Sequence, residues 1–275
     1  LAEGSVSMKI GVAGCGRMGF GMARAMARSG LDVTGFDVRP IEEFGEFANR
    51  MAADPGSFAG DREVIITVVR DIAQTEALLF DEQAILGKSP RLRYLVVSST
   101  LSPRYFASLA ERMPEGVIVI DAPMSGAQVA ADEGRLSFML GGEEADLDLL
   151  QPAFEAMGTK IHRVGPAGAG MTAKVLNNFV AGSAMAGVRQ ALDWAGDLGV
   201  DRERLLALMH DSSGQTWFGS NFDQIEFARN GYDVENTVGI LKKDLESCLD
   251  AVDPETHSGF PEALVAAIGR LKPIN

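Results

Sequence analysis

The sequence predicts an α/β fold, in which a doubly wound parallel sheet is followed by an all-α C-terminal domain. Short β-branched runs alternate with helical patterns over the first part of the 275 residues, in the order expected of βαβαβ units. From about Gly165 the strand signals stop, and the segments that follow have helical periodicity. The change falls near "VGPAGAG", which predicts one domain over residues 8–165 and a second over residues 166–275.

Five runs are expected to form the strands: "KIGVAG", "LDVTGFD", "EVIITVV", "YLVVSS" and "GVIVID". They are largely continuous apolar runs, which is typical of parallel strands that are covered on both faces. The helices are expected at residues 17–30 and 103–113, in a long Ala/Gly-rich segment that ends near Leu198, and at residues 201–213, 237–252 and 261–271.

Composition excludes several kinds of partner. A formal net charge of -13, without a dense Lys/Arg cluster, argues against nucleic acid. Cys15 and Cys248 can form neither a disulfide framework nor a metal site, so no metal and a reducing cytoplasm are expected. The most apolar helix contains Lys174, Asn177 and Asn178, which argues against a membrane span.

The first seven residues are expected to lie outside the fold. They lack the basic and apolar regions of a signal peptide, and Met8 begins the first periodic segment. We therefore interpret Leu1 to Ser7 as an appended segment.

The segment "GVAGCGRMG" contains the spacing Gly14-x-Gly16-x-x-Gly19 between an expected strand and an expected helix. The first glycine allows a tight turn, the second lets a pyrophosphate approach the backbone, and the third lets the helix pack close to the strand. The phosphates, beside Arg17 and Met18, would then meet the free N–H groups of the helix N-terminus. A Rossmann-like dinucleotide site is expected, with a structural turn as the alternative.

The second expected strand ends in Asp37, and this residue bears on the choice of cofactor. A carboxylate there can accept hydrogen bonds from the ribose hydroxyls and would repel a 2'-phosphate. NAD is therefore expected, while Arg39 keeps NADP possible.

Several dehydrogenase classes do not fit. Tyr94, Tyr105 and Tyr232 all lack the lysine four residues later that short-chain enzymes need. None of the three histidines has a setting that suggests an acid/base role, and zinc chemistry has too few ligands.

Lys174 is the remaining candidate for acid/base chemistry. It is the only charged residue between Arg163 and Arg189, and Asn178 lies on the same helical face one turn later. Apolar surroundings lower the pKa of a lysine from its reference value of about 10.4 toward the range where it can act as a base. The alternative is a structural lysine whose stem covers apolar atoms while its ammonium reaches solvent.

Four segments, taken in order, resemble the β-hydroxyacid dehydrogenase family, of which 3-hydroxyisobutyrate dehydrogenase and tartronate semialdehyde reductase are members. They are "GVAGCGRMG", "DAPMSGAQVAADEGRLSFMLGG", "GAGMTAKVLNN" and "LKKDL". The resemblance implies reversible hydride transfer between a nicotinamide cofactor and a small β-hydroxy acid, and at least a dimer, either a homodimer or a homotetramer.

The resemblance also implies roles for individual residues. Lys174 matches the catalytic lysine and Asn178 a substrate-binding asparagine. The carboxylate-binding segment corresponds to Ser125, Gly126 and Ala127, where the family usually has a second glycine in place of the alanine. Positions that contact the cofactor correspond to Thr100 and Lys243.

Alternatives remain open for the substrate and the function. The stretch "AQTEALLF" resembles relatives that act on polyhydroxy acids such as threonate. Imine reduction is a second enzymatic possibility, although those relatives usually replace the lysine. The possibility from another class is a non-catalytic NAD(P)-binding module.

Overall fold

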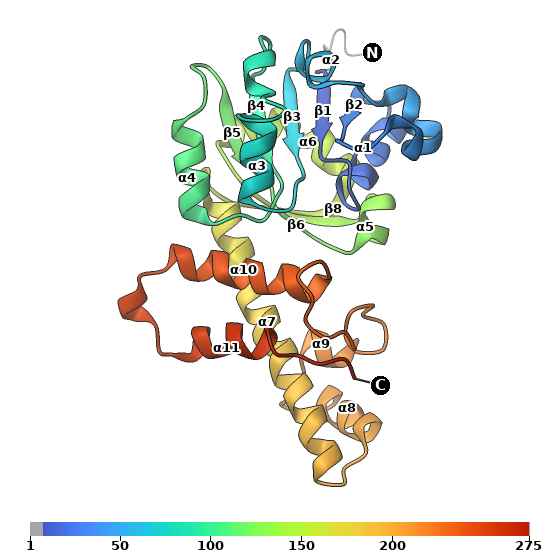
Figure 1. The fold of residues 1–275 in the computed structure, drawn as a ribbon, viewed down its shortest axis with the longest axis vertical. Coiled ribbons are helices and arrows are strands. Elements are labelled where there is room, and N and C mark those ends of the chain that lie inside the picture. The colour runs from blue at the N-terminus through green and yellow to red at the C-terminus, as the bar shows by residue number, and fades with distance from the viewer. Residues whose placement is uncertain (1–7, 275) are drawn as a thin grey trace. The chain divides into compact units, whose positions relative to one another are not determined.

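The computed structural model describes residues 8–274, so the expectation for Leu1 to Ser7 lies outside the described residues. The chain divides into two compact units, residues 1–174 and 175–275. Figure 1 shows a sheet with helices in the first and helices alone in the second.

Five parallel strands form the main part of the sheet. Each of the runs expected as a strand contains one of them, in the spatial order β2-β1-β3-β4-β5. Their bounds are β1 Ile10–Ala13, β2 Val33–Phe36, β3 Val64–Thr67, β4 Tyr94–Val97 and β5 Ile118–Asp121. The predicted parallel sheet is confirmed.

The strand order reverses beside β1, because β2 lies on one side of it and β3 on the other. Ligands of open α/β sheets bind at such a point, outside the carboxyl ends of the strands. The chain next to β2 is irregular: the 3₁₀ segment η1 (Ile41–Arg50) leads to Met51, which forms an isolated parallel bridge with Gly35.

Helices cover both faces of the sheet, which confirms the doubly wound arrangement (Figure 1). On one face Val12, Ile66 and Val96 pack with residues of α1 (Gly19–Arg28) and α6 (Glu144–Met157). On the other, Ile65, Leu95 and Val97 pack with residues of three helices. These are α2 (Pro55–Ala59), α3 (Ile72–Leu79) and α4 (Pro103–Glu111). Successive side chains point to opposite faces of a strand, so continuous apolar runs are buried on both sides.

The sheet continues into a mixed part that the sequence did not reveal. Strand β7 (Leu136–Gly141) is antiparallel to β5 and to β6 (Met124–Ser125), and parallel to β8 (Gly158–Gly165). The short helix α5 (Gln128–Asp132) joins β6 to β7, and the 3₁₀ turn η2 (Leu86–Lys88) precedes β4. A two-residue strand and a strand interrupted by charged residues lack the continuous apolar runs of the parallel strands.

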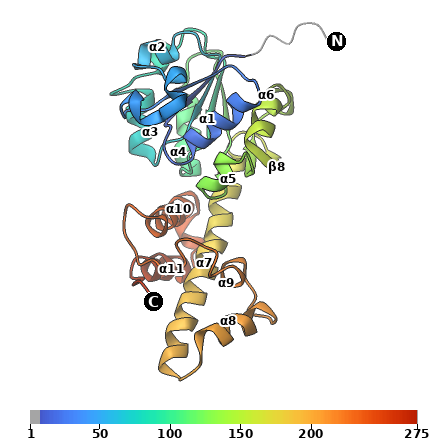
Figure 2. The same cartoon turned by 90° about the vertical axis from the view of Figure 1, so that its right-hand side faces the viewer.

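The described part of the second unit is helical, as expected. Its elements are the greater part of α7 (Ala169–Asp197), α8 (Arg202–His210), α9 (Trp217–Ser220), α10 (Thr237–Ala251), η3 (Pro254–Thr256) and α11 (Phe260–Ile268). Figure 2 shows α10 and α11 beside α7. A Cβ at Gly182 of α7 would lie 3.1 Å from a methyl group of Leu245 and 3.4 Å from one of Ile268, so this glycine allows close packing.

The core of this unit is formed by side chains from α7, α9, α10 and α11, among them Val188, Phe218, Leu245 and Leu264. Trp217, beside Phe218, is 68% exposed and is not a core residue. No helix within residues 8–274 has both the length and the apolar character needed to cross a membrane.

Candidate active site

The loop between β1 and α1 has the shape that its three glycines predict. Gly14 has φ +92°, and a Cβ on it would lie 2.5 Å from the carbonyl oxygen of Val68. A Cβ at Gly19 would lie 2.1 Å from the carbonyl oxygen of Gly14, so α1 can begin this close to the strand only with glycine. Around Gly16, in contrast, a Cβ would meet nothing within 4 Å.

The open space at Gly16 fits a dinucleotide pyrophosphate. Met18 occupies the N-cap position of α1 and makes no side-chain capping bond, while Gly16 and Arg17 are exposed. The N–H of Phe20 donates to the Gly16 carbonyl at 3.1 Å, while the N–H groups of Gly19 and Gly21 in this first turn have no side-chain cap and can donate to an anion. The loop can hold the phosphates of NAD or NADP.

Cys15 lies within this loop but is not suited to redox chemistry. Its side chain is fully buried, and burial raises the pKa of the thiol to about 12. Because the thiolate is the reactive form, Cys15 is a packing residue.

Asp37, just after β2, is bound by Arg39. The Asp37 Oδ1 accepts from the Arg39 backbone N–H at 3.0 Å and from its Nε at 3.1 Å. The same guanidinium donates from Nη2 to the Cys15 carbonyl at 2.7 Å and lies 4.8 Å from the centre of the Phe44 ring. The structure thus brings both residues that bear on cofactor choice to the glycine loop.

The turns after β3 and β4 complete this rim of the sheet. Thr100 is half-buried in the turn after β4, and the Oγ of its neighbour Ser99 accepts from the Val69 N–H at 3.0 Å. In the turn after β3, the backbone N–H of Arg70 donates to Gln74 Oε1 at 3.0 Å. Both turns lie at the carboxyl ends of parallel strands, where nucleotides bind.

Lys174 lies in the second turn of α7 and is 7% exposed. Its Nζ donates to Ser125 Oγ at 3.0 Å. The structure therefore joins the lysine to the first residue of the segment expected to bind a carboxylate. Because Oγ accepts in this bond, the Ser125 hydroxyl keeps its own hydrogen for another acceptor.

Gly126 and Ala127 follow directly. Gly126 has φ +139°, which disfavours any residue with a Cβ, and a Cβ there would lie 2.9 Å from Leu136 Cδ2 and 3.0 Å from Ala130 Cβ. Both residues are exposed. Their backbone N–H groups are donors that suit an anion.

Asp121 fixes the start of the helix that carries Lys174. This fully buried residue ends β5, and its carboxylate accepts from the backbone N–H of Gly168 at 2.7 Å and from that of Met171. Burial raises the pKa of Asp121, while the N–H donors at the start of α7 oppose that shift. Glycine at 141 makes room, since a Cβ there would lie 2.2 Å from Asp121 Oδ1.

Asn178 is 8% exposed, and its Nδ2 donates to Asp244 Oδ2 at 2.6 Å. Lys243 Nζ lies 2.8 Å from the other carboxylate oxygen of Asp244. Asn177, one residue earlier, is exposed and donates from Nδ2 to Asn178 Oδ1 at 3.3 Å. Within the second unit, Asp244 therefore joins Asn178 to Lys243.

Sequence reasoning missed Asp121 and Asp244, and a signal in the sequence was present only for Asp121. Asp121 opens the segment "DAPMSGA", and Asp244 follows Lys243 in "LKKDL". Asp121 directly follows the apolar run "GVIVI", and a carboxylate there is unusual because a buried charge is costly unless it is paired. Asp244 stands among charged residues, so its sequence neighbours do not indicate burial.

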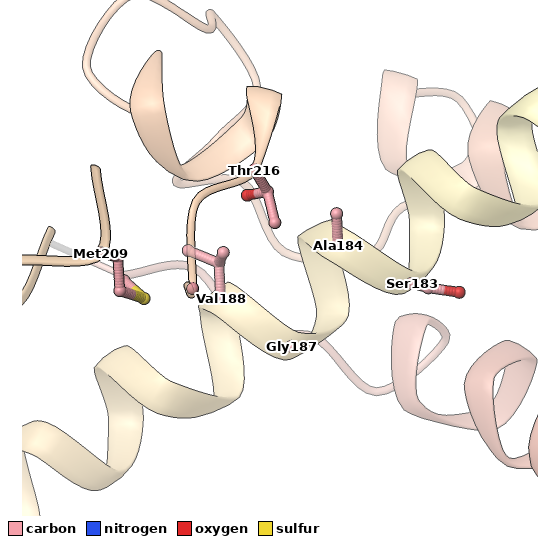
Figure 3. A pocket seen from close by; sticks show the side chains of 7 residues that line it. Ser183, Ala184, Gly187, Val188, Met209 and Thr216 are labelled. Carbon is pink, nitrogen blue, oxygen red and sulfur yellow. The ribbon is translucent and has the colours of Figure 1, made fainter. Parts of the chain in front are cut away.

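A cavity of about 280 Å³ opens in the second unit (Figure 3). It is lined by Ser183, Ala184, Gly187, Val188, Met209, Gly214 and Thr216. Ser183 comes nine residues after Lys174, roughly 14 Å along α7 at 1.5 Å per residue. The lining has no acid or base, so we assign no catalytic role to this cavity. Among residues 8–274, no group of three His, Cys, Asp or Glu side chains could hold a metal ion.

The parallel sheet and its glycine loop at the reversal point are those of the NAD(P)-dependent dehydrogenases. Residues 9–165 match the family model described as the NAD binding domain of 6-phosphogluconate dehydrogenase. Residues 168–268 match the one described as NAD-binding of NADP-dependent 3-hydroxyisobutyrate dehydrogenase. The chain belongs to the 3-hydroxyisobutyrate dehydrogenase family of hydroxyacid dehydrogenases, as the resemblance implied.

Individual relatives agree with this assignment. The chain is 31% identical to L-threonate dehydrogenase of Cupriavidus necator, over 95% of this chain and 88% of that protein. It is 30% identical to mitochondrial 3-hydroxyisobutyrate dehydrogenase of Mus musculus, over 82% and 69% of the two chains. The crystal structure of 3-hydroxyisobutyrate dehydrogenase from Salmonella typhimurium has a TM-score of 0.80, with 25% identity over 97% of this chain and 96% of that one.

The loop geometry predicts different outcomes for two alanine substitutions. Gly16→Ala should leave the free energy of unfolding within about 0.5 kcal/mol, because the Cβ enters open space. It should weaken NAD binding about tenfold or more, by obstructing the approach of the pyrophosphate to the backbone. Gly19→Ala should instead destabilise the protein by roughly 1–3 kcal/mol, because its Cβ overlaps a backbone carbonyl.

Thermal unfolding without cofactor and NAD titration by fluorescence check both variants. Tight NAD binding by Gly16→Ala would contradict the assignment of this loop to the pyrophosphate.

Proposed function

We propose that Lys174 is the general acid/base of a reversible β-hydroxy acid oxidation. In the direction of oxidation its neutral amine takes the proton of the substrate hydroxyl, and in the direction of reduction its ammonium returns that proton. The observation that carries the proposal is the 3.0 Å contact between the buried Lys174 Nζ and Ser125 Oγ. A positioned amine can accept or donate the proton of a substrate, and the Ser125 hydroxyl beside it can donate its hydrogen to the bound anion.

The other proposed roles follow from their donors and acceptors. Ser125, Gly126 and Ala127 bind the substrate carboxylate through one hydroxyl and backbone N–H groups, which orients the hydroxyl-bearing carbon. Asn178, one turn after Lys174 on α7, orients the reacting oxygen. Imine reduction has no need of a lysine base, so Lys174 favours hydroxy acid chemistry.

The glycine loop residues Gly14, Gly16, Arg17, Met18 and Gly19 are proposed to hold the cofactor. Thr100 and Lys243 are proposed to contact it near the nicotinamide. When bound, this group supplies the hydride acceptor for oxidation, or in its reduced form the hydride donor.

The proposed substrate is a small β-hydroxy acid similar to 3-hydroxyisobutyrate, or the corresponding semialdehyde. A polyhydroxy acid similar to threonate is the second candidate, and the match to an L-threonate dehydrogenase over 95% of this chain favours it. Ala127 in place of the usual glycine keeps the N–H donor but narrows the space beside it, which favours a compact acid.

Two further assignments are proposals of the same kind. The dinucleotide-binding domain comprises residues 8–165, and residues 166–275 form the substrate and oligomerisation domain. A cytoplasmic setting is supported by the two cysteines, which are free and buried.

Replacement of Lys174 tests the proposed mechanism. Lys174→Met keeps much of the length and the apolar stem but removes the amine, so kcat should fall by about 10²–10⁴-fold. The affinity for NAD should change less than about twofold, since the cofactor loop is untouched. The measurement is NAD reduction at saturating cofactor over a panel of β-hydroxy acids and polyhydroxy acids.

Lys160→Met is the control, because Lys160 is exposed on β8, and it should leave kcat unchanged. Retention of most of the turnover by Lys174→Met would refute the general base. If the wild-type protein bound NAD but reduced it with none of the acids in the panel, a binding module without turnover would be favoured.

NAD is the proposed physiological cofactor, because Asp37 places a carboxylate where a 2'-phosphate would bring further negative charge. We expect kcat/KM for NAD to exceed that for NADP by about tenfold or more. Asp37→Ser should lower the ratio of the two kcat/KM values, mainly by raising kcat/KM for NADP. Arg39→Ala should increase the ratio. Kinetics with each cofactor measure the ratio, and a preference of the wild-type protein for NADP would overturn the proposal.

The exposed face of α7 supports a homodimer or homotetramer. Leu176, Val180 and Trp194 are 49%, 67% and 59% exposed, and with Gly187 they follow one another along one side of the helix. Residues spaced by four and by seven share a helical face, so they form an apolar stripe. Apolar stripes of this kind mark protein interfaces.

Light scattering should therefore give at least twice the mass of the 29.3 kDa chain. Val180→Asp should shift the protein toward the monomer, because an unpaired charge would be buried at the interface. The control is Leu149→Asp, which changes an exposed leucine of α6 and should leave the mass unchanged. A monomeric wild-type protein at working concentration would contradict the proposal.

A further inference from the structure

Asp244 is a buried carboxylate to which the proposed function gives no role. It lies on α10 and is 4% exposed. Its two oxygens have different partners: Oδ2 accepts from Asn178 Nδ2 at 2.6 Å, and Oδ1 lies 2.8 Å from Lys243 Nζ. One carboxylate therefore holds a residue proposed to bind substrate and another proposed to contact the cofactor.

The chemistry of these groups fixes the orientation of the Asn178 amide. An ionised carboxylate accepts hydrogen bonds and cannot donate them, so the nitrogen of the amide must face Asp244. The contact with Asn177 agrees, because the Asn177 Nδ2 donates to the Asn178 Oδ1 at 3.3 Å. The orientation of the Asn178 amide is then fixed, and with it the directions of its second Nδ2 hydrogen and its carbonyl oxygen.

Stability alone is a poor explanation for this arrangement. A buried ion pair is often no more stabilising than apolar side chains of similar volume, because desolvation of the charges offsets their attraction. Lys242 and Glu246 form an ion pair on the same helix in which the carboxylate is 50% exposed, whereas the Asp244 side chain is 5% exposed, so the desolvation cost falls on Asp244.

We propose that Asp244 is a positioning residue that fixes the Asn178 amide for the substrate. The inference rests on the proposed function of Asn178. It predicts that Asp244 affects the reaction chiefly through Asn178, and that the two residues are coupled.

A double-mutant cycle on the full chain tests this. Asp244→Asn has nearly the same shape but can present a donor to the Asn178 amide, which removes the constraint on its orientation. In the wild-type background it should lower kcat/KM for the hydroxy acid by about tenfold. In an Asn178→Ala background the same substitution should change kcat/KM by less than about twofold, because the positioned group is gone.

Glu246→Gln is the matched control, since it also removes a carboxylate and an ion pair from α10 but at an exposed position. It should leave kcat/KM unchanged. Equal losses from Asp244→Asn in both backgrounds would overturn the inference and leave the role of Asn178 intact. If Asn178→Ala alone had no effect, the proposed role of Asn178 would fail, and the inference with it.

A spectroscopic measurement covers the case in which Asp244→Asn does not fold. In the wild-type protein, one side-chain amide proton of Asn178 should resonate far downfield in the NMR spectrum, because of its short bond to a carboxylate. The resonance is assigned by its loss in Asn178→Ala. An Asn178 amide with two ordinary, rapidly exchanging protons would overturn the inference.

Discussion

The position of Lys174 depends on the buried carboxylate of Asp121. A helix begins with N–H groups that lack partners within the helix, and Asp121 satisfies two of these at the start of α7. Ser125, four residues after Asp121, then accepts from the lysine itself. The segment from Asp121 to Ser125, at the end of β5, thus binds the backbone of α7 at its first turn and the side chain of Lys174 at its second turn.

The sequence predicted the parallel sheet because each of its strands is an unbroken apolar run that needs cover on both faces. It predicted the glycine loop because each glycine meets a different constraint, visible in the contacts that a Cβ would make at positions 14, 16 and 19. The mixed strands β6, β7 and β8 escaped prediction. Their pairing depends on tertiary contacts, such as that of Asp121 with Gly141, which no local pattern encodes.

The candidate site was predictable where a residue type conflicts with its surroundings. A single lysine in a long apolar helix is such a conflict, and the structure buries it against Ser125. Asp121 and Asp244 were not found, because their partners lie 47 and 66 residues away in the chain. The sequence shows Asp121 after an apolar run and Asp244 among charged residues, but only the folded chain shows which donors satisfy the two carboxylates.

The bridge between Gly35 and Met51 covers part of the edge of β2. Strand β2 is only four residues long, and an open edge strand is a template on which another chain can add by backbone pairing. Here Met51 occupies the place of an incoming strand, and the N–H of Ala52 donates to the carbonyl oxygen of Gly35 at 2.9 Å. Because the carbonyl of Gly35 is engaged in this way, the middle of the outer edge of β2 is not available for backbone pairing with another chain.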